Sequence, residues 1–546
     1  MTYVSPLEEA AFNQSPLFAG QNLFALDKPL QDAVARAGVP LAPFTEFGRA
    51  WGSADAFEDG RLANENGPKL RIADPKGNRV DVVEFHPAYH AMMRRSTDAG
   101  LHCSAFEATN QPSAVQARAA LQYMAVGVEA GHMCPITMTH AAIPALRAAA
   151  PADLYGHLEP RLLARTYDPS AKPWFEKSAI TIGMGMTERQ GGTDVRANIS
   201  RARNSGDHAL ITGHKWFMSA PMCDAFLVLA QSENGLSCFL VPRHRPDGNR
   251  NGLYFRRLKP KLGNISNASS EVEFIDAYAI PIGPEGQGVK TIIEMVQWTR
   301  LDCAVSSAGL MRMALAEAMH HVHNRTVFQR KLIDQPLMRA VLADMALELE
   351  AMTALVFRLA RAFDEKARSE TDAVYARLMT PVVKYLVCKR APQFVYEALE
   401  CLGGNGYVEE LPLARLYREA PLNAIWEGSG NVMALDMLRA LGKTGAEAQA
   451  LLTHVANAAD RAVPAITEAN RDLAAALLAG QLESRARAVI ERLGHFAATA
   501  ALAEANSPFT ELYANSRLAG RWADQFGTID IPLAKQSALL SRAYAA

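Results

Sequence analysis

The stretch MGMTERQGGTD, residues 184–194, places threonines among glycines at the point where a short strand-like segment ends. Glycine lets the backbone approach a ligand closely, and the hydroxyl groups of Thr187 and Thr193 add hydrogen-bond donors. A glycine-rich loop beside a strand is equally typical of an ordinary connection. By itself, this stretch does not distinguish a ligand-binding loop from an ordinary connection.

The second stretch is GHKWFMS, residues 213–219, in which an aromatic pair precedes a hydroxyl residue. Such a pair can stack on a flat heterocycle while the hydroxyl group bonds the edge of the ring. Within a strand, however, a Trp-Phe pair is more often part of the ordinary core.

The third stretch begins with LGGNGY, residues 402–407, and continues to IWEGSGN, residues 425–431. A helix ends in glycines, and Glu427 then lies in a Gly/Ser-rich loop just before the next helix. Such a loop can approach a phosphate and offer amide groups at a helix N-terminus. Taken alone, a glutamate in this position is usually solvated or caps the helix.

The hydrophobic period changes twice along the chain. It favours helices over 116–129 and 140–149, and it favours short strands between about 180 and 285, with Asn234-Gly235 as a hairpin signal. The first forty residues are irregular and predict an arm that needs a partner surface. Beyond residue 288 the helical period returns, with long helices expected over 289–323, 337–367, 372–402 and 432–441.

These patterns predict four domains. They are an N-terminal arm and helical domain (1–180), a mostly antiparallel β domain (181–285), a helical bundle (286–445) and a C-terminal helical domain (446–546).

The composition narrows the class of protein. With 546 residues, 49% hydrophobic residues and a net charge of −1, the chain is neither globally disordered nor one large basic surface. Its seven cysteines are scattered and show no zinc-ligand spacing, so we expect no metal and a reducing, cytoplasmic location. No run of about 20 apolar residues predicts a membrane span.

Together the three stretches resemble the acyl-CoA dehydrogenase family over roughly residues 120–441. GPEGQG at 283–288, KLG at 261–263 and the order of Arg325, Phe328, Gln335 and Pro336 agree with this resemblance. It implies FAD as cofactor, an acyl-CoA substrate and a mainly α fold with a central β-barrel. That fold consists of a helical domain, a barrel and a helical bundle, to which this chain adds an extra C-terminal helical domain.

The resemblance also implies roles for single residues. Glu427 is the expected base that removes the α-proton, because the alternative family position, on the first bundle helix, is occupied by Thr299. Thr193 is expected near the thioester or CoA. Arg325 should pair with FAD phosphates of a neighbouring subunit, which implies a homotetramer. The predicted cofactor-binding residues are Met184, Gly185, Met186, Thr187, Gly192, Thr193, Phe217, Met218, Ser219, Arg325, Ile425, Trp426, Gly428, Ser429, Gly430 and Asn431.

Two departures from the family pattern stand out. The usual Phe-Gly after Arg325 is Phe328-Gln329, which puts the close backbone approach to a phosphate in doubt. Trp426 replaces the commoner tyrosine beside the base and adds bulk near the acyl pocket.

His132 and His140, eight residues apart, are more often core or surface histidines than ligands.

Within the family, the alkylation-response branch is most similar, on the evidence of GHMCPITMT at 131–139 and of the hundred residues that follow the third stretch. That branch implies binding of double-stranded DNA without sequence specificity, protection against alkylation damage and weak dehydrogenase activity. The segment 447–546 has nine Lys/Arg and ten Asp/Glu, so its charge does not support DNA binding. The candidate phosphate contacts are Arg439, Arg485, Arg492, Arg517 and Arg521. The alternative is an ordinary acyl-CoA dehydrogenase whose C-terminal extension serves oligomerisation or another partner.

Overall fold

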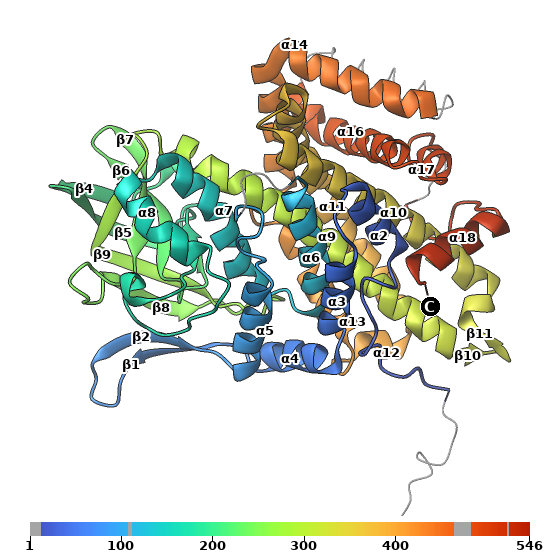
Figure 1. The fold of residues 1–546 in the computed structure, drawn as a ribbon, viewed down its shortest axis with the longest axis horizontal. Helices are drawn as coiled ribbons and strands as arrows, with labels where there is room; N and C mark the ends of the chain where they lie inside the picture. Colours follow the sequence, from blue (N-terminus) through green and yellow to red (C-terminus); the bar gives the residue numbers. More distant parts are fainter. Residues whose placement is uncertain (1–12, 108–111, 463–481, 521–523, 546) are drawn as a thin grey trace, which may run out of the picture.

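The computed structural model describes residues 13–107, 112–462, 482–520 and 524–545 (Figure 1). A barrel of strands lies at one end, and long helices form the rest of the molecule. The N-terminal region contributes α2 (Lys28–Arg36), α3 (Ala42–Trp51), α4 (Ala54–Glu65), α5 (Pro87–Asp98), α6 (Ala114–Val128), α7 (Met133–Ala149) and α8 (Ala152–Leu162). The helices α6 and α7 correspond to the predicted helices 116–129 and 140–149, with α6 ending one residue earlier and α7 beginning seven residues earlier.

A β-hairpin that the sequence patterns did not predict interrupts these helices. The strands β1 (Lys69–Ala73) and β2 (Arg79–Glu84) pair antiparallel, with Lys69 opposite Glu84. The turn between them is closed by Asp74, whose carboxylate accepts hydrogen bonds from the backbone N–H groups of Lys76 and Asn78, both at 2.8 Å. Turn chemistry of this kind favours a hairpin over a continued helix.

The N-terminal segment packs on its own chain. Phe18, Phe24 and Leu30 are all buried, and Asp27 forms an ion pair with Arg312 of the bundle at 2.9 Å. The arm was predicted to need a partner surface, and residues 13–40 find that surface within the same chain.

Five strands close into a barrel: β4 (Arg201–Ser205), β5 (His208–Ser219), β6 (Ala225–Ser232), β7 (Gly235–Pro242) and β9 (Ser269–Ile282). Pairing runs from β4 to β5, β9, β7 and β6, and β6 pairs with β4 again. Asn234-Gly235 forms the expected hairpin between β6 and β7, with Ser232 opposite Gly235. Two further strands pair with this ring: β3 (Ile182–Gly185) lies parallel to β6, and β8 (Leu253–Leu258) lies antiparallel to β9.

Four long helices form the bundle: α9 (Gly288–Asn324), α10 (Pro336–Glu365), α11 (Glu370–Cys401) and α14 (Gly430–Ala462). The central helix α9 is buried on nearly every side, which agrees with the apolar residues all around its surface. Between α9 and α10 lie the short strands β10 (Thr326–Val327) and β11 (Arg330–Lys331), and between α11 and α14 the helices α12 (Gly404–Tyr407) and α13 (Pro412–Glu419). The predicted fold, mainly α around a central barrel, is confirmed.

The C-terminal helices α16 (Leu482–Glu504), α17 (Thr510–Arg517) and α18 (Leu533–Ala543) pack on α10 and α11 (Figure 1). Helix α14 runs through residue 445, where the bundle domain was predicted to end. The division into domains stays a prediction. In the part of the chain that the structure describes, no helix is long and apolar enough to cross a membrane.

Candidate active site

Glu427 lies in the loop before α14, between α9 and α11. Its backbone has a φ of 58°, in the left-handed region that non-glycine residues rarely adopt. The hydroxyl group of Thr299 on α9 donates a hydrogen bond to Oε2 of Glu427 at 2.7 Å. Thr299 has no carboxylate and cannot serve as the base, and the structure places it as a hydrogen-bond donor to the predicted base instead.

Two cations hold the backbone around Glu427. Nε of Arg300 donates to the carbonyl of Glu427 at 2.9 Å, and Nζ of the buried Lys384 donates to the carbonyls of Trp426 (2.9 Å) and Gly428 (2.5 Å). Three consecutive carbonyls are therefore fixed by charged donors. This arrangement offsets the unfavourable backbone conformation of Glu427, because such strain persists only where the surroundings determine the geometry.

Arg300 is itself anchored by an ion pair. Arg300 pairs with Asp436 of α14 at 2.7 Å, and Arg377 of α11 pairs with the same carboxylate at 2.9 Å. The loop is thus tied to three helices of the bundle. Sequence reasoning missed Lys384, Arg377 and Asp436, because a charged residue within a long helix carries no signal that it will meet a loop.

The pKa of the Glu427 carboxyl group is raised. Burial is the main cause, and the hydrogen bond from Thr299 and the charges of Arg300 and Lys384 counter part of the rise. A carboxylate with a raised pKa is a better proton acceptor than one in water. The arrangement therefore suits a general base.

The predicted flavin segments lie on neighbouring parts of the barrel. In β5 the alternation of the strand leaves Phe217 exposed (51%) and buries Met218, so Met218 offers only its backbone to a ligand. The flanking Ser219 is half-buried. Strand β3, which contains Met184 and Gly185, pairs with β6 along one edge, and no pairing of its other edge is formed within the described residues.

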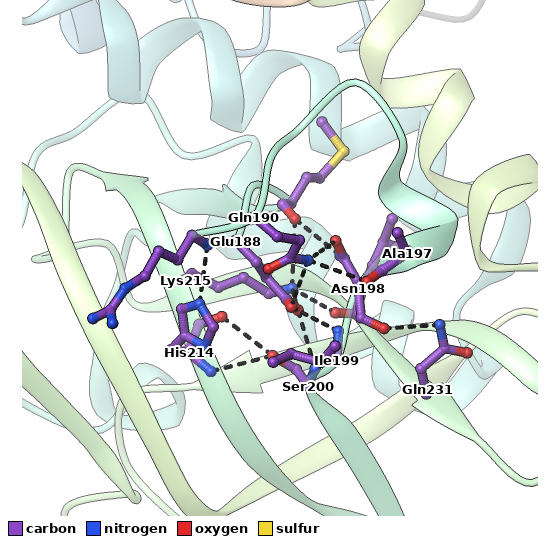
Figure 2. A network of polar contacts seen from close by, with 12 residues as sticks. Glu188, Gln190, Ala197, Asn198, Ile199, Ser200, His214, Lys215 and Gln231 are labelled. Atoms are coloured by element: carbon purple, nitrogen blue, oxygen red, sulfur yellow. Dashed lines mark hydrogen bonds and ion pairs between the residues drawn. The ribbon is translucent and has the colours of Figure 1, made fainter.

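A buried ion pair connects these segments (Figure 2). Nζ of Lys215, in β5, lies 2.9 Å from Oε1 of Glu188, and both side chains are fully buried. The carboxylate of Glu188 also accepts hydrogen bonds from the backbone N–H groups of Ile199 (2.7 Å) and Ser200 (3.2 Å). It thereby closes the loop that contains Gly192 and Thr193, both of which are exposed.

The charge of Lys215 is central to this network. It lowers the pKa of Glu188 to about 2, although burial alone would raise it. Figure 2 also shows His214, whose Nε2 accepts a hydrogen bond from the N–H group of Arg189 at 2.9 Å. Glu188 and Lys215 lie within the first and second stretches, but the sequence did not predict their pairing, because it needs a loop and a strand to meet.

The third segment, residues 425–431, leads into the N-terminus of α14. Ile425 is 64% exposed, and Trp426 donates from Nε1 to the side chain of Asn423 at 2.9 Å. Gly428 has a φ of 108°, which a side chain rarely tolerates. Ser429 directly precedes α14, and Gly430 and Asn431 begin this helix, whose 33 residues provide a helix dipole toward an anionic group.

Arg325 directly follows the C-terminal end of α9, far from Thr299, the residue of that helix that bonds Glu427. Thr299 and Arg325 are 26 residues apart, and at 1.5 Å per residue this separation is about 39 Å. A flavin ring beside Glu427 and a phosphate beside Arg325 of one chain would thus be widely separated, which agrees with the expectation that Arg325 serves a neighbouring subunit. Phe328 and Gln329 have φ values of 49° and 65°, so Gln329 adopts the conformation for which the family uses glycine.

The predicted DNA contacts have different environments. Arg517 is wrong as a phosphate contact, because its side chain is fully buried and paired with Asp344 (2.6 Å) and Glu348 (2.8 Å) of α10. Arg439 and Arg485 are exposed, and Arg492 is half-buried. Arg521 lies outside the described residues.

His132 and His140 are both buried and contact other side chains of the core. Nδ1 of His132 lies 2.7 Å from Glu129, and its Nε2 lies 2.8 Å from Ser96; all three side chains are buried. His140 is buried between the rings of Phe106 and Trp298. Among the described residues, no group of three or more His, Cys, Asp or Glu is placed to hold a metal ion.

Three protein-family models match parts of this chain. Residues 183–277 match the middle domain of acyl-CoA dehydrogenases, and residues 286–442 match their C-terminal domain. Residues 13–169 match the N-terminal domain of the adaptive response protein AidB. AidB of Escherichia coli (strain K12) is 49% identical over 435 residues, which cover 79% of this chain and 80% of that protein.

The chain belongs to the acyl-CoA dehydrogenase family. Acyl-CoA dehydrogenase family member 11 of Caenorhabditis elegans is 32% identical over 76% of this chain and 70% of that protein. The solved structure of Caenorhabditis elegans ACDH-11 in complex with C11-CoA has a TM-score of 0.84 at 27% identity, covering 97% of this chain and 95% of that chain. The protein is an acyl-CoA dehydrogenase-type oxidoreductase whose cofactor is FAD.

The residues of this acyl-CoA dehydrogenase-family chain fit the cofactor. The free edge of β3 and the exposed ring of Phe217 suit the edge and face of an isoalloxazine, and the N-terminus of α14 suits a diphosphate. The assignment of individual flavin contacts stays a prediction.

Proposed function

We propose that Glu427 removes the α-proton of an acyl-CoA thioester while the β-hydride leaves, so that an α,β-double bond forms. FAD, when bound, supplies the chemistry that accepts this hydride and its two electrons. The observation that carries the proposal is the position of Glu427: its carboxylate is partly buried, bonded by Thr299, and set on a backbone whose carbonyls are held by Arg300 and Lys384.

The surrounding residues have distinct tasks in this mechanism. Lys384 and Arg300 fix where the carboxylate lies, and therefore which substrate carbon it can reach. Trp426 and Ile425 add apolar bulk beside it, which helps to exclude water from the reacting carbon. Thr193, on the exposed loop closed by Glu188, is our candidate for contact with the thioester or CoA.

The direct test is reduction of the flavin by acyl-CoA substrates of different chain length under anaerobic conditions. Glu427→Gln should keep FAD and bind the thioester, yet reduce the flavin at least 100-fold more slowly. Unchanged reduction in this variant would show that the base lies elsewhere.

We further propose that the chain binds double-stranded DNA without sequence specificity and protects it from alkylation, and that its dehydrogenase activity is weak. The match of residues 13–169 to the AidB N-terminal domain supports this proposal, as does the identity to AidB over most of the chain. A homotetramer in the cytoplasm is part of the same proposal. Assembly would bring several weak arginine surfaces together and so strengthen binding.

DNA binding is best tested on the full-length chain, because α17 forms buried ion pairs with α10 and its removal would expose charged core residues. Affinity for unrelated duplexes should be similar and should fall steeply with salt. The alternative is an ordinary acyl-CoA dehydrogenase whose C-terminal extension serves oligomerisation or another partner. Efficient acyl-CoA turnover without duplex binding at low salt would favour that alternative.

A further inference from the structure

A cavity of about 380 Å³ lies at the far end of α9. It is bounded by α9, by the turns around α12 and by residues 14–18 of the N-terminal segment, which runs beside α12 (Figure 1). Glu317 in its wall is 18 residues from Thr299 on the same helix, or about 27 Å. The cavity is therefore separate from the Glu427 site.

The cavity walls are held by specific contacts. His320 bonds the carbonyl of Pro16 at 2.9 Å through Nε2, and its Nδ1 lies 3.0 Å from the hydroxyl group of Tyr544. His321 bonds Ser15 at 3.0 Å. On the opposite side, Asn405 donates to the side chain of Gln14 at 2.9 Å. The N-terminal segment thus forms an ordered wall of the cavity.

Glu317 is the unusual group in this wall. It is 6% exposed, and no hydrogen bond reaches its carboxyl group from the described residues. The positive charge of Arg415 lowers the pKa of Glu317 in part. The guanidinium of Arg415, however, donates its hydrogen bond to the carbonyl of Val128 at 2.9 Å. Burial raises the pKa of Glu317 to about 8. A carboxyl group that lines a cavity and receives no hydrogen bond from the described residues favours a ligand that brings donors.

We propose that this cavity binds an organic ammonium ion, whose charged group pairs with Glu317 and whose apolar part lies against Leu17, Leu402 and Val408. An ammonium group brings three donors and the positive charge that the wall lacks. Glu410 at the rim adds a second negative charge that favours the same ligand. The volume lies within the range of small-molecule sites.

The test uses the full-length, FAD-loaded protein and three probes of equal length: hexylammonium, hexanol and hexanoate. Calorimetry should show saturable binding of hexylammonium, with hexanol and hexanoate at least tenfold weaker. Glu317→Gln keeps the shape of the side chain and should weaken hexylammonium binding about tenfold or more. Glu409→Gln is the matched control, because Glu409 is paired with Arg418 and does not line the cavity.

The pH dependence provides a second readout. The groups near Glu317 are His320 and His321 on its own helix, Arg415 on α13, Glu410 at the rim and Tyr544 from the C-terminus. Because Glu317 must lose its proton to pair with the ammonium group, affinity should rise and a proton should be released between pH 7 and pH 9. The Glu317→Gln variant should show neither effect.

An occlusion variant tests the location without changing Glu317. Val408→Trp, at the rim, should abolish hexylammonium binding. Equal binding of hexanoate, unchanged binding in Glu317→Gln, or no binding to the wild-type protein would each overturn the proposal. Binding only to the flavin-free chain would assign the cavity to part of the flavin and would also overturn it.

Discussion

Thr299 donates a hydrogen bond of 2.7 Å to the carboxylate of Glu427 across 128 residues of sequence. These are the two positions at which the family resemblance places the catalytic base. In this chain they touch each other, so one position carries the carboxylate and the other adjusts its proton affinity.

Replacing Glu427 by Gln should slow flavin reduction by an acyl-CoA at least 100-fold, because an amide cannot accept the α-proton. The amide can still accept the hydrogen bond from Thr299, so the loop should keep its shape. Stopped-flow bleaching of the flavin measures the rate. The flavin absorbance before substrate addition is the control for cofactor content, and a normal rate would exclude Glu427 as the base.

Replacing Thr299 by Val should shift the acid limb of the rate–pH profile to higher pH. The hydroxyl group lowers the pKa of Glu427, so its removal raises that pKa further, and the carboxylate form is reached only at higher pH. Thr299→Ser keeps the donor and should leave the limb in place. A profile that does not move in Thr299→Val would show that the hydrogen bond has no influence on the base.

Replacing Lys215 by Met should destabilise the protein by about 3–5 kcal/mol, because Glu188 would remain buried without its cation. The double variant Lys215→Met/Glu188→Gln should recover part of this loss in denaturant unfolding. In the wild type the pKa of Glu188 is lowered from 4.5 to about 2, so its stabilisation is present above pH 4.5 and is lost as the pH falls toward 2. Additive single effects in the double variant would argue against the pair.

Replacing the buried Arg517 should affect stability, whereas replacing the exposed Arg439 and Arg485 should affect DNA binding. Arg517→Met should lower stability by about 3–5 kcal/mol, since Asp344 and Glu348 lose a buried partner. Arg439→Ala/Arg485→Ala should leave the melting temperature nearly unchanged and flatten the salt dependence of duplex binding. Thermal melts and salt titrations separate these effects, and an unaltered salt slope in the second variant would place the DNA surface elsewhere.

Replacing Gln329 by Gly should raise stability by about 1 kcal/mol, because a φ of 65° is unfavourable for a residue with a Cβ atom. Gln329→Ala keeps the Cβ atom and should bring no such gain. Urea unfolding of both variants measures the difference. Equal stability of the two variants would show that the backbone at this turn relaxes without cost.

Much of the fold could be predicted from periodicity. The barrel strands, the hairpin at Asn234-Gly235 and the long bundle helices lie close to their expected positions, because each depends on local pattern and turn chemistry. The hairpin at 69–84 was missed, since its strands are short and largely polar on one face. The end of α14 was placed too early, because Gly442 and Gly445 indicate a helix end, whereas the helix continues through both of them to Ala462.

By itself, the sequence determined the family, the FAD cofactor and the identity of the expected base, since these depend on residue types at characteristic spacing. Only the tertiary structure showed that Thr299 bonds Glu427, that Lys384 and Arg300 hold three consecutive carbonyls, and that Arg517 is buried. Each of these contacts joins residues more than 40 positions apart. Helical spacing tells which residues share a face of one helix, but the partner of that face, and hence burial, charge pairing and pKa, depend on how the helices and loops pack together.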